Sequence, residues 1–202
     1  MALQDRRTLI VDAAIELIAA QGIRALTHRA LDNALALPAG STSYYFRTKR
    51  ALLEAVVDHI TARTRDDFLA AFPDNPPTPE AGDHAQVIAQ LAGGIGAWLD
   101  DLLARRRAHL IVRYALTIEL SADPELHRRL VGSLFSHPRA RALFEHLGAE
   151  DPDTAAADFI AVIEGATFDR FAGARTGLPT GTPDSAVQLA GVLSAYLRGA
   201  LP

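Results

Sequence analysis

The sequence of 202 residues contains no cysteine and no apolar run long enough to cross a membrane. Without thiols, the chain cannot form disulfides, zinc–thiolate sites, iron–sulfur clusters or a cysteine nucleophile. Charges or glycines interrupt every apolar stretch well before the ~18 residues that a membrane-spanning helix needs. Asp5, Arg6 and Arg7 come first, and acidic residues interrupt the segment that follows, which does not fit a secretion signal. We therefore expect a cytoplasmic protein without a membrane partner.

The signatures of common catalytic and metal sites are missing as well. The histidines include no i,i+4 pair and no His-Glu-x-x-His pattern, so the sequence predicts no metal site. There is no Walker sequence, no Gly-x-Ser-x-Gly elbow and no Gly-x-Gly-x-x-Gly after a strand. Because no acid–base or nucleophile set stands out either, we expect a protein that is not an enzyme and uses no cofactor. An all-α carrier or enzyme that does not bind DNA is the alternative.

The residues that are present describe a globular protein with an uneven charge. Hydrophobic residues make up 49% and charged residues 22%, which excludes wholesale disorder. The net charge of −4 argues against a general nucleic-acid coat. Residues 1–65 nevertheless carry nine Lys/Arg against six Asp/Glu, while the rest of the chain is acidic. A basic first third on an acidic body indicates two separate functions.

Apolar residues recur three and four positions apart in nearly every segment, and no stretch alternates with period two. The sequence therefore predicts an all-α fold of about nine helices. Residues 72–79 contain four prolines and are predicted to be a linker. Pro138 is expected to kink or split the helical segment 125–147. Three later helices are expected to begin at a capping residue followed by proline, namely Asp123-Pro124, Asp151-Pro152 and Thr182-Pro183.

The first part of the chain has the spacing of a helix-turn-helix unit. A long helix ends at Gly22, a short one follows from Thr27, and a tight connection leads into a very short helix over 38–46. That last helix carries small, hydroxylated and phenolic side chains, which suit phosphates and base edges in a major groove. Lys49, the only lysine, follows at the start of the next helix, where it can face a phosphate. From spacing alone, ordinary packing in an all-α protein explains the pattern equally well.

Residues 8–60 resemble the DNA-binding domain of the TetR family of bacterial transcriptional repressors. The family has Leu-Thr at the start of its second helix, a Gly-Thr-Leu-Tyr-Tyr-His-Phe type recognition helix, and a lysine before Ala-Leu-Leu. The matching stretches here are Leu26-Thr27, Arg29-Ala30-Leu31, Gly40-Ser41, Tyr44-Tyr45-Phe46 and Lys49-Arg50-Ala51-Leu52-Leu53. The resemblance implies a helix-turn-helix domain over 1–47, a connecting fourth helix over 48–72, and a ligand-binding and dimerisation domain over 73–202.

The resemblance also implies which residues contact DNA. Residues at the start of the second helix would touch phosphates, the short helix would enter the major groove, and two tyrosines and the lysine would hold flanking phosphates. These residues are Thr27, His28, Ala39, Gly40, Ser41, Ser43, Tyr44, Tyr45 and Lys49. Thr42 and Ser43 replace the usual leucine and tyrosine, and Arg47 can compensate for the lost phosphate contact. Pro38 replaces the usual capping serine, so we expect a helix amide to be left for DNA or water.

The second domain is expected to form a homodimer through the last two helices, which the resemblance implies pack as a four-helix bundle with their mates. The sequence agrees independently, because residues 152–175 and 183–197 are apolar on more than one face and rich in small residues. A thick core in a monomer is the alternative. Together, these features favour a regulator that binds a double-stranded DNA operator, more as a repressor released by a small molecule than as an activator.

A ligand pocket is predicted from aromatic residues with a few polar anchors on the middle and later helices. Ordinary packing explains each of these residues at least as well, and the sequence does not identify the effector. A buried Arg113 would favour an acidic ligand or would pair with Glu119 or Glu164. The candidates are Trp98, Arg113, Tyr114, Thr117, Phe135, Glu164 and Phe168.

Overall fold

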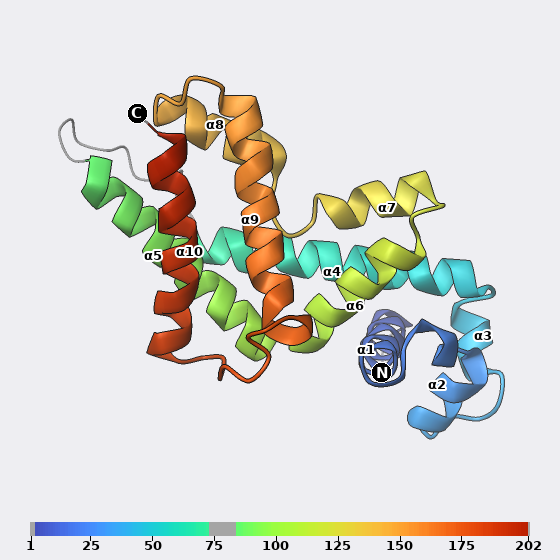
Figure 1. The fold of residues 1–202 in the computed structure, drawn as a ribbon. Coiled ribbons are helices and arrows are strands. Elements are labelled where there is room, and N and C mark those ends of the chain that lie inside the picture. Colours follow the sequence, from blue (N-terminus) through green and yellow to red (C-terminus); the bar gives the residue numbers. More distant parts are fainter. Residues whose placement is uncertain (1–2, 73–83, 202) are drawn as a thin grey trace. The chain divides into compact units, whose positions relative to one another are not determined.

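The structure, a computed structural model, describes residues 3–72 and 84–201. Within these residues the chain forms ten α-helices and one 3-10 helix and no strand, which confirms the all-α prediction (Figure 1). The helices are α1 (Leu3–Gln21), the 3-10 helix η1 (Ile23–Ala25), α2 (His28–Ala34), α3 (Ser41–Tyr45), α4 (Lys49–Ala71), α5 (His84–Arg105), α6 (Arg107–Glu119), α7 (Pro124–Val131), α8 (His137–His146), α9 (Pro152–Ala172) and α10 (Pro183–Ala200).

The predicted helix starts are confirmed at α7, α9 and α10. Asp123, Asp151 and Thr182 each accept a hydrogen bond from a backbone amide three residues later, with proline in the first turn. The segment 125–147 is split, because α7 ends at Val131 and α8 begins again with Pro138 in its first turn. This split accounts for the tenth helix. The predicted linker lies outside the described residues apart from Phe72, which follows the last turn of α4.

The chain divides into two compact units that are not two consecutive stretches of sequence. The first unit holds the residues up to 65 together with 108–133, and the second holds 66–107 and 134–202. Helices α6 and α7 therefore belong with the N-terminal helices, and the last turns of α4 belong with the C-terminal helices. The sequence-based division followed chain order, whereas packing groups helices whose apolar faces meet.

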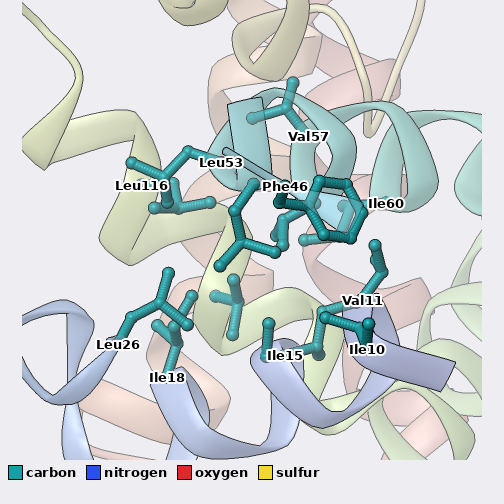
Figure 2. Packing of buried hydrophobic residues seen from close by; sticks show 14 of the residues in the cluster. Ile10, Val11, Ile15, Ile18, Leu26, Phe46, Leu53, Val57, Ile60 and Leu116 are labelled. Atoms are coloured by element: carbon teal, nitrogen blue, oxygen red, sulfur yellow. The ribbon is translucent and has the colours of Figure 1, made fainter. Parts of the chain in front are cut away.

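The core of the first unit is almost wholly aliphatic. Side chains from α1, α4 and α6 meet around Phe46, as Figure 2 shows for Ile18, Leu53 and Leu116. Further contributions come from Leu126 and other residues of α7. Because close-packed aliphatic side chains allow little rearrangement, this core gives the short helices α2 and α3 a rigid support.

The second unit packs α5, α9 and α10 closely together. A methyl group on Gly96 of α5 would lie 2.8 Å from the Ala190 nitrogen and 3.0 Å from the Ala186 carbonyl oxygen of α10. Gly96 thus permits the close packing of α5 on α10. The expectation that no segment is apolar enough to cross a membrane does not hold for α5, because residues 85–105 qualify by length and mean hydropathy. However, 61% of the qualifying segment is buried, as in a core helix of a soluble protein.

A buried polar network also ties these helices together. Arg170 of α9 is 1% exposed and donates to the Ser185 hydroxyl (2.6 Å) and the Leu178 carbonyl (3.3 Å). Asp100 of α5 accepts from the same hydroxyl and from the Gly181 amide. Desolvation lowers the pKa of the Arg170 guanidinium, and the charge of Asp100 partly offsets this effect. The network fixes the start of α10 against α5 and α9.

Candidate nucleic-acid interface

Helices α2 and α3 are joined by a turn that needs two unusual backbone conformations. Thr27 caps α2, because its hydroxyl oxygen accepts from the Ala30 amide at 3.1 Å. After α2 the chain reverses through Ala36, at φ 50°, and reaches Gly40, at φ 88°. Glycine adopts this left-handed conformation without the steric cost that a side chain adds. The turn therefore presents α3 at a fixed angle to α2.

The first turn of α3 is held by a carboxylate that the sequence analysis did not single out. Asp32 of α2 is 3% exposed, and its oxygens accept from the Gly40 and Thr42 amides, both at 2.8 Å. It also accepts from the fully buried Thr42 hydroxyl at 2.7 Å. This hydroxyl and the two amides lower the pKa of the Asp32 carboxyl, although burial alone would raise it.

Pro38 does not leave the Gly40, Ser41 or Thr42 amide for DNA or water. The Ser41 amide bonds to the Pro38 carbonyl at 3.1 Å, and Asp32 takes the amides on either side. In the sequence, Pro38 and Thr42 are two unrelated departures from the family pattern. In the structure both are explained by Asp32, which bonds to the Thr42 hydroxyl and caps the helix that Pro38 cannot cap. A buried aspartate ten residues upstream does the work of a capping serine, which local sequence could not reveal.

The predicted groove residues form the exposed ridge of α3 and its preceding turn. Ala39, Gly40 and Ser43 are exposed, and Ser41 is half-buried. The Ser41 hydroxyl donates to the Pro38 carbonyl at 2.6 Å and the Ser43 hydroxyl donates to the Gly40 carbonyl at 2.8 Å. Each hydroxyl oxygen keeps lone pairs that can accept from cytosine or adenine amino groups in a major groove.

The two adjacent tyrosines have different environments. Tyr44 is 75% exposed, whereas Tyr45 is half-buried against the core of the first unit, and their rings meet edge to face at 5.2 Å. Arg7 of α1, which the sequence analysis did not select, donates to the Tyr45 carbonyl at 2.7 Å and lies 4.3 Å from the Phe46 ring centre. Arg7 therefore fixes the C-terminal end of α3 on α1.

The remaining predicted DNA contacts surround this ridge. Lys49 is exposed, and its ammonium group donates to the Ile23 carbonyl at 3.1 Å, which ties the start of α4 to η1. Thr27 and Arg47 are exposed. His28 is half-buried, and its Nε2 atom is buried without a hydrogen-bond partner among the described residues.

The start of α4 is also tied to α7 within the first unit. Arg50 pairs with Glu54 on its own helix at 2.9 Å and with Asp123, the capping residue of α7. This pairing raises the pKa of Arg50 and, together with the Leu126 amide, lowers that of Asp123. Arg50 is largely exposed and Asp123 is half-buried, so the pair orients α4 more than it stabilises the fold.

Two of the predicted ligand residues lie together in the second unit, with two phenylalanines that the sequence analysis missed. The ring centres of Trp98 and Phe135 are 6.2 Å apart, and Phe68 lies 5.3 Å from Trp98 and 5.5 Å from Phe135. Phe72 lies 6.1 Å from Trp98. We call Phe68, Phe72, Trp98 and Phe135 the aromatic cluster. The i,i+4 spacing of Phe68 and Phe72 was a usable signal, but that end of α4 had been assigned to the connection.

The other candidates in the second unit lie on α9. Phe168 is 40% exposed, and its ring centre is 5.5 Å from that of Phe171. Glu164 is half-buried one turn earlier. Both residues lie beside the exposed small residues Ala161 and Gly165, on the outward side of α9.

Arg113, Tyr114 and Thr117 lie on α6, in the first unit. Arg113 is 2% exposed and donates to the Ser133 hydroxyl at 2.8 Å and to the Val131 carbonyl at 3.1 Å. Its guanidinium lies 5.0 Å from the Tyr114 ring centre, and the Thr117 hydroxyl donates to the Arg113 carbonyl. Within this unit Arg113 therefore anchors the end of α7.

The chain matches two protein-family descriptions, one over each part. Residues 10–56 match "Bacterial regulatory proteins, tetR family", and residues 82–202 match "Tetracyclin repressor-like, C-terminal domain". No curated protein matches the chain.

Solved structures share the fold over nearly the whole chain. A transcriptional regulator from Rhodococcus sp. Rha1 is 17% identical, covers 96% of this chain and 95% of its own, and superposes with a TM-score of 0.71. A TetR-family member from Streptomyces coelicolor A3 is 24% identical, with 98% of both chains covered and a TM-score of 0.68. The multidrug binding protein EbrR in complex with ethidium is 24% identical, with 98% and 99% coverage and a TM-score of 0.64.

These matches agree with the helical N-terminal unit and the all-α second unit. Family members are DNA-binding regulators rather than enzymes, so the expected functional class is confirmed. The chain belongs to the TetR family of bacterial transcriptional regulators.

Proposed function

We propose that this cytoplasmic regulator is a repressor that leaves a palindromic operator when a small molecule binds its second unit. The observation that carries the proposal is the exposed ridge of α3, held from beneath by Asp32 and flanked by the largely exposed Tyr44. A rigid helix with hydroxyl acceptors on its outer side suits base edges better than it suits any packing role.

The DNA contacts divide into two groups by chemistry. Ala39, Gly40, Ser41 and Ser43 would face base edges, because their small size allows the backbone to approach closely. Phosphates on either side would be bound by Thr27, His28, Tyr44, Tyr45 and Lys49. In the free protein, Lys49 already donates to a carbonyl, so it reaches a phosphate by exchanging that bond or by using another of its three N–H groups.

Dimerisation through α9 and α10 is supported by the outward rows of these helices. Ala157, Ala161 and Gly165 recur every four residues on the exposed side of α9. On α10, Val187 is 71% exposed, and Gly191 and Ala195 continue its row. Figure 1 shows the two helices running side by side. Their small residues, together with the exposed Val187 and Phe168, form a flat apolar surface against which a partner copy can pack.

An Ala195→Arg variant tests this dimer. Placing a charged side chain on the row should dissociate the dimer, which analytical ultracentrifugation detects as a halving of the mass. Ala89→Arg, on the exposed side of α5, is the matched control and should leave the mass unchanged. If Ala195→Arg remains a dimer, the last two helices do not form the interface.

An effector would act by binding better when the two recognition helices are spaced wrongly for DNA. Helix α4 contributes residues to both units, which makes it the element that can transmit such a change. A coupling free energy of ~1–3 kcal/mol would change operator affinity by roughly 5–150-fold. The related EbrR structures hold imidazole, ethidium or proflavin, which supports a small-molecule effector for this chain.

Selection from a library of randomised DNA duplexes tests the central proposal. We expect enrichment of a sequence with two inverted half-sites about 34 Å apart, since each copy supplies one recognition helix. Anisotropy titrations of the enriched duplex should show affinity that falls steeply with salt, because several phosphates are neutralised. Enrichment of no sequence, or of a single half-site only, would contradict the proposal.

A further inference from the structure

The indole of Trp98 has a buried hydrogen-bond donor without an acceptor. Trp98 is 5% exposed, and its Nε1 atom has no hydrogen-bond partner among the described residues. Indole N–H groups are donors only, and buried tryptophans ordinarily find a partner. A buried donor left without one costs free energy that a suitable ligand atom can recover.

The groups around this donor are rings. Phe68 meets the indole edge to face at 85°, and Phe72 and Phe135 meet it at 69° and 66°. Phenylalanine rings supply apolar faces and edges but no oxygen or nitrogen acceptor, and an N–H contact with a ring is weaker than one with a carbonyl. The aromatic cluster therefore has flat apolar walls and one buried polar donor, and the Arg139 guanidinium lies 5.4 Å from the centre of the Phe68 ring.

The cluster reaches the surface next to two glycines of α5. Among the described residues, a methyl group on Gly93 would meet nothing within 4 Å, and one on Gly94 would meet only Phe72, at 3.7 Å from its Cε1 atom. Gly94 is exposed and Phe72 is half-buried. One turn before Trp98, α5 therefore carries no side chain at two successive positions, and the ring of Phe72 lies beside them.

We infer that the aromatic cluster of Phe68, Phe72, Trp98 and Phe135 binds a flat aromatic molecule whose carbonyl oxygen accepts a hydrogen bond from the Trp98 indole. The rings bury the flat body of the ligand, and the indole selects for an acceptor at one edge. This inference rests on the proposed function in one respect, since it names the chemical class of the small-molecule effector.

A matched pair of probes tests the inference on the full-length protein. The two molecules 1-indanone and indane share a nearly flat carbon skeleton and differ only in the carbonyl group. Because the carbonyl satisfies a buried donor, we expect 1-indanone to bind roughly tenfold more tightly than indane. Trp98 is the only tryptophan, so the protein labelled with ¹⁵N gives a single indole N–H resonance. That resonance should move downfield with 1-indanone and not with indane.

Variants locate the effect at the indole. Trp98→Phe keeps a ring but removes the donor, so the affinity for 1-indanone, measured by calorimetry, should fall to that for indane. Phe72→Leu should weaken both probes, whereas the control Phe171→Leu, on α9 outside the cluster, should weaken neither. If Trp98→Phe fails to fold, the comparison of the two probes on the unaltered protein still decides the question. Equal affinity for the two probes, no binding of either, or an unmoved indole resonance would overturn the inference.

The outcome is separable from that of the proposed function. If 1-indanone binds at the indole but does not weaken binding to the selected duplex, the ligand site is supported. The proposal that such a ligand releases the protein from DNA is then wrong. If neither probe distinguishes the indole but the duplex is bound with inverted half-sites, the DNA-binding proposal stands and this inference fails.

Discussion

The interior of the first unit is aliphatic around a single buried phenylalanine, whereas the second unit contains a row of rings from Phe68 to Tyr196. Each unit buries polar atoms without a partner among the described residues, His28 Nε2 in the first and Trp98 Nε1 and Arg170 Nε in the second. The difference lies at the two proposed sites. Beneath α3, Asp32 accepts hydrogen bonds from two amides and a hydroxyl, whereas in the aromatic cluster the Trp98 indole has no acceptor among the described residues. Reading DNA requires a fixed ridge, while sensing a ligand requires a donor that the ligand can satisfy.

Removing Asp32 is the severest way to break this comparison. In Asp32→Ala, two amides and a hydroxyl lose their acceptor, so we expect a loss of about 2–4 kcal/mol in the free energy of unfolding. DNA affinity should fall by more than the stability loss alone explains, because α3 is no longer held. Denaturant unfolding and anisotropy measure the two effects, and Asn33→Ala, at the exposed neighbouring position, is the control.

The same carboxylate predicts a pH dependence. Its pKa is lowered below the ordinary value of 3.8 in the folded protein, so its contribution is fully present above that value. The contribution is lost as pH falls through the folded pKa. The stability difference between the unaltered protein and Asp32→Asn should therefore shrink under strongly acidic conditions. A difference that grows on acidification would contradict the assignment.

Adding a methyl group to α5 tests whether the second unit is packed as tightly between α5 and α10 as the first unit is around Asp32. Gly96→Ala would place Cβ against the backbone of α10, so we expect a loss of about 1–3 kcal/mol. Gly93→Ala, on the same helix with open space around it, should instead stabilise by about 0.5–1 kcal/mol. Thermal unfolding of the two variants measures both signs. If both variants lose similar amounts of stability, the contact between Gly96 and α10 is not the cause of the loss.

Tyr44→Ala sharpens the contrast between the exposed ridge and its support. Because Tyr44 is 75% exposed, its removal should leave the melting temperature unchanged while DNA affinity falls about tenfold through a lost phosphate contact. Competition binding with the selected duplex measures this loss. A lowered melting temperature with unchanged affinity would show that the tyrosine is a packing residue.

Lys49→Met gives the smallest expected effect. Removing one phosphate contact should reduce the slope of log affinity against log salt by about one unit. The free protein also loses the bond to the Ile23 carbonyl, which lies at the surface and costs little. Anisotropy titrations at several salt concentrations measure the slope. An unchanged slope would remove Lys49 from the residues that contact phosphate.

Local signals in the sequence were sufficient where the structure is local. The capping residues of α7, α9 and α10 and the split near Pro138 depend on hydrogen bonds and backbone limits within a few residues. The family resemblance likewise rested on one contiguous stretch. Helix α2 lies where it was predicted, whereas α3 begins at Ser41, three residues after the predicted start at Pro38. The identities of the DNA contacts remain predictions.

Contacts between distant residues could not be predicted in this way. The seven predicted ligand residues fall into both units, and only Trp98 and Phe135 lie within the aromatic cluster. Arg113 was weighed as an anchor for an acidic ligand, yet its donors reach Ser133 and Val131, about twenty residues away. Helix periodicity shows which face of a helix is apolar but not which other helix covers that face.

The sequence by itself determined most of the helices, the capped starts of α7, α9 and α10 and the family of the protein, because these depend on neighbouring residues and on a contiguous motif. Only the tertiary structure decided that Asp32 caps α3, that Phe68 and Phe72 meet Trp98, and that α6 and α7 belong with the N-terminal helices. Asp32 reaches α3 across a turn of eight to ten residues, and the other two features arise from packing between segments farther apart in the chain. In each case the free energy depends on how surfaces fit together and not on any single pattern.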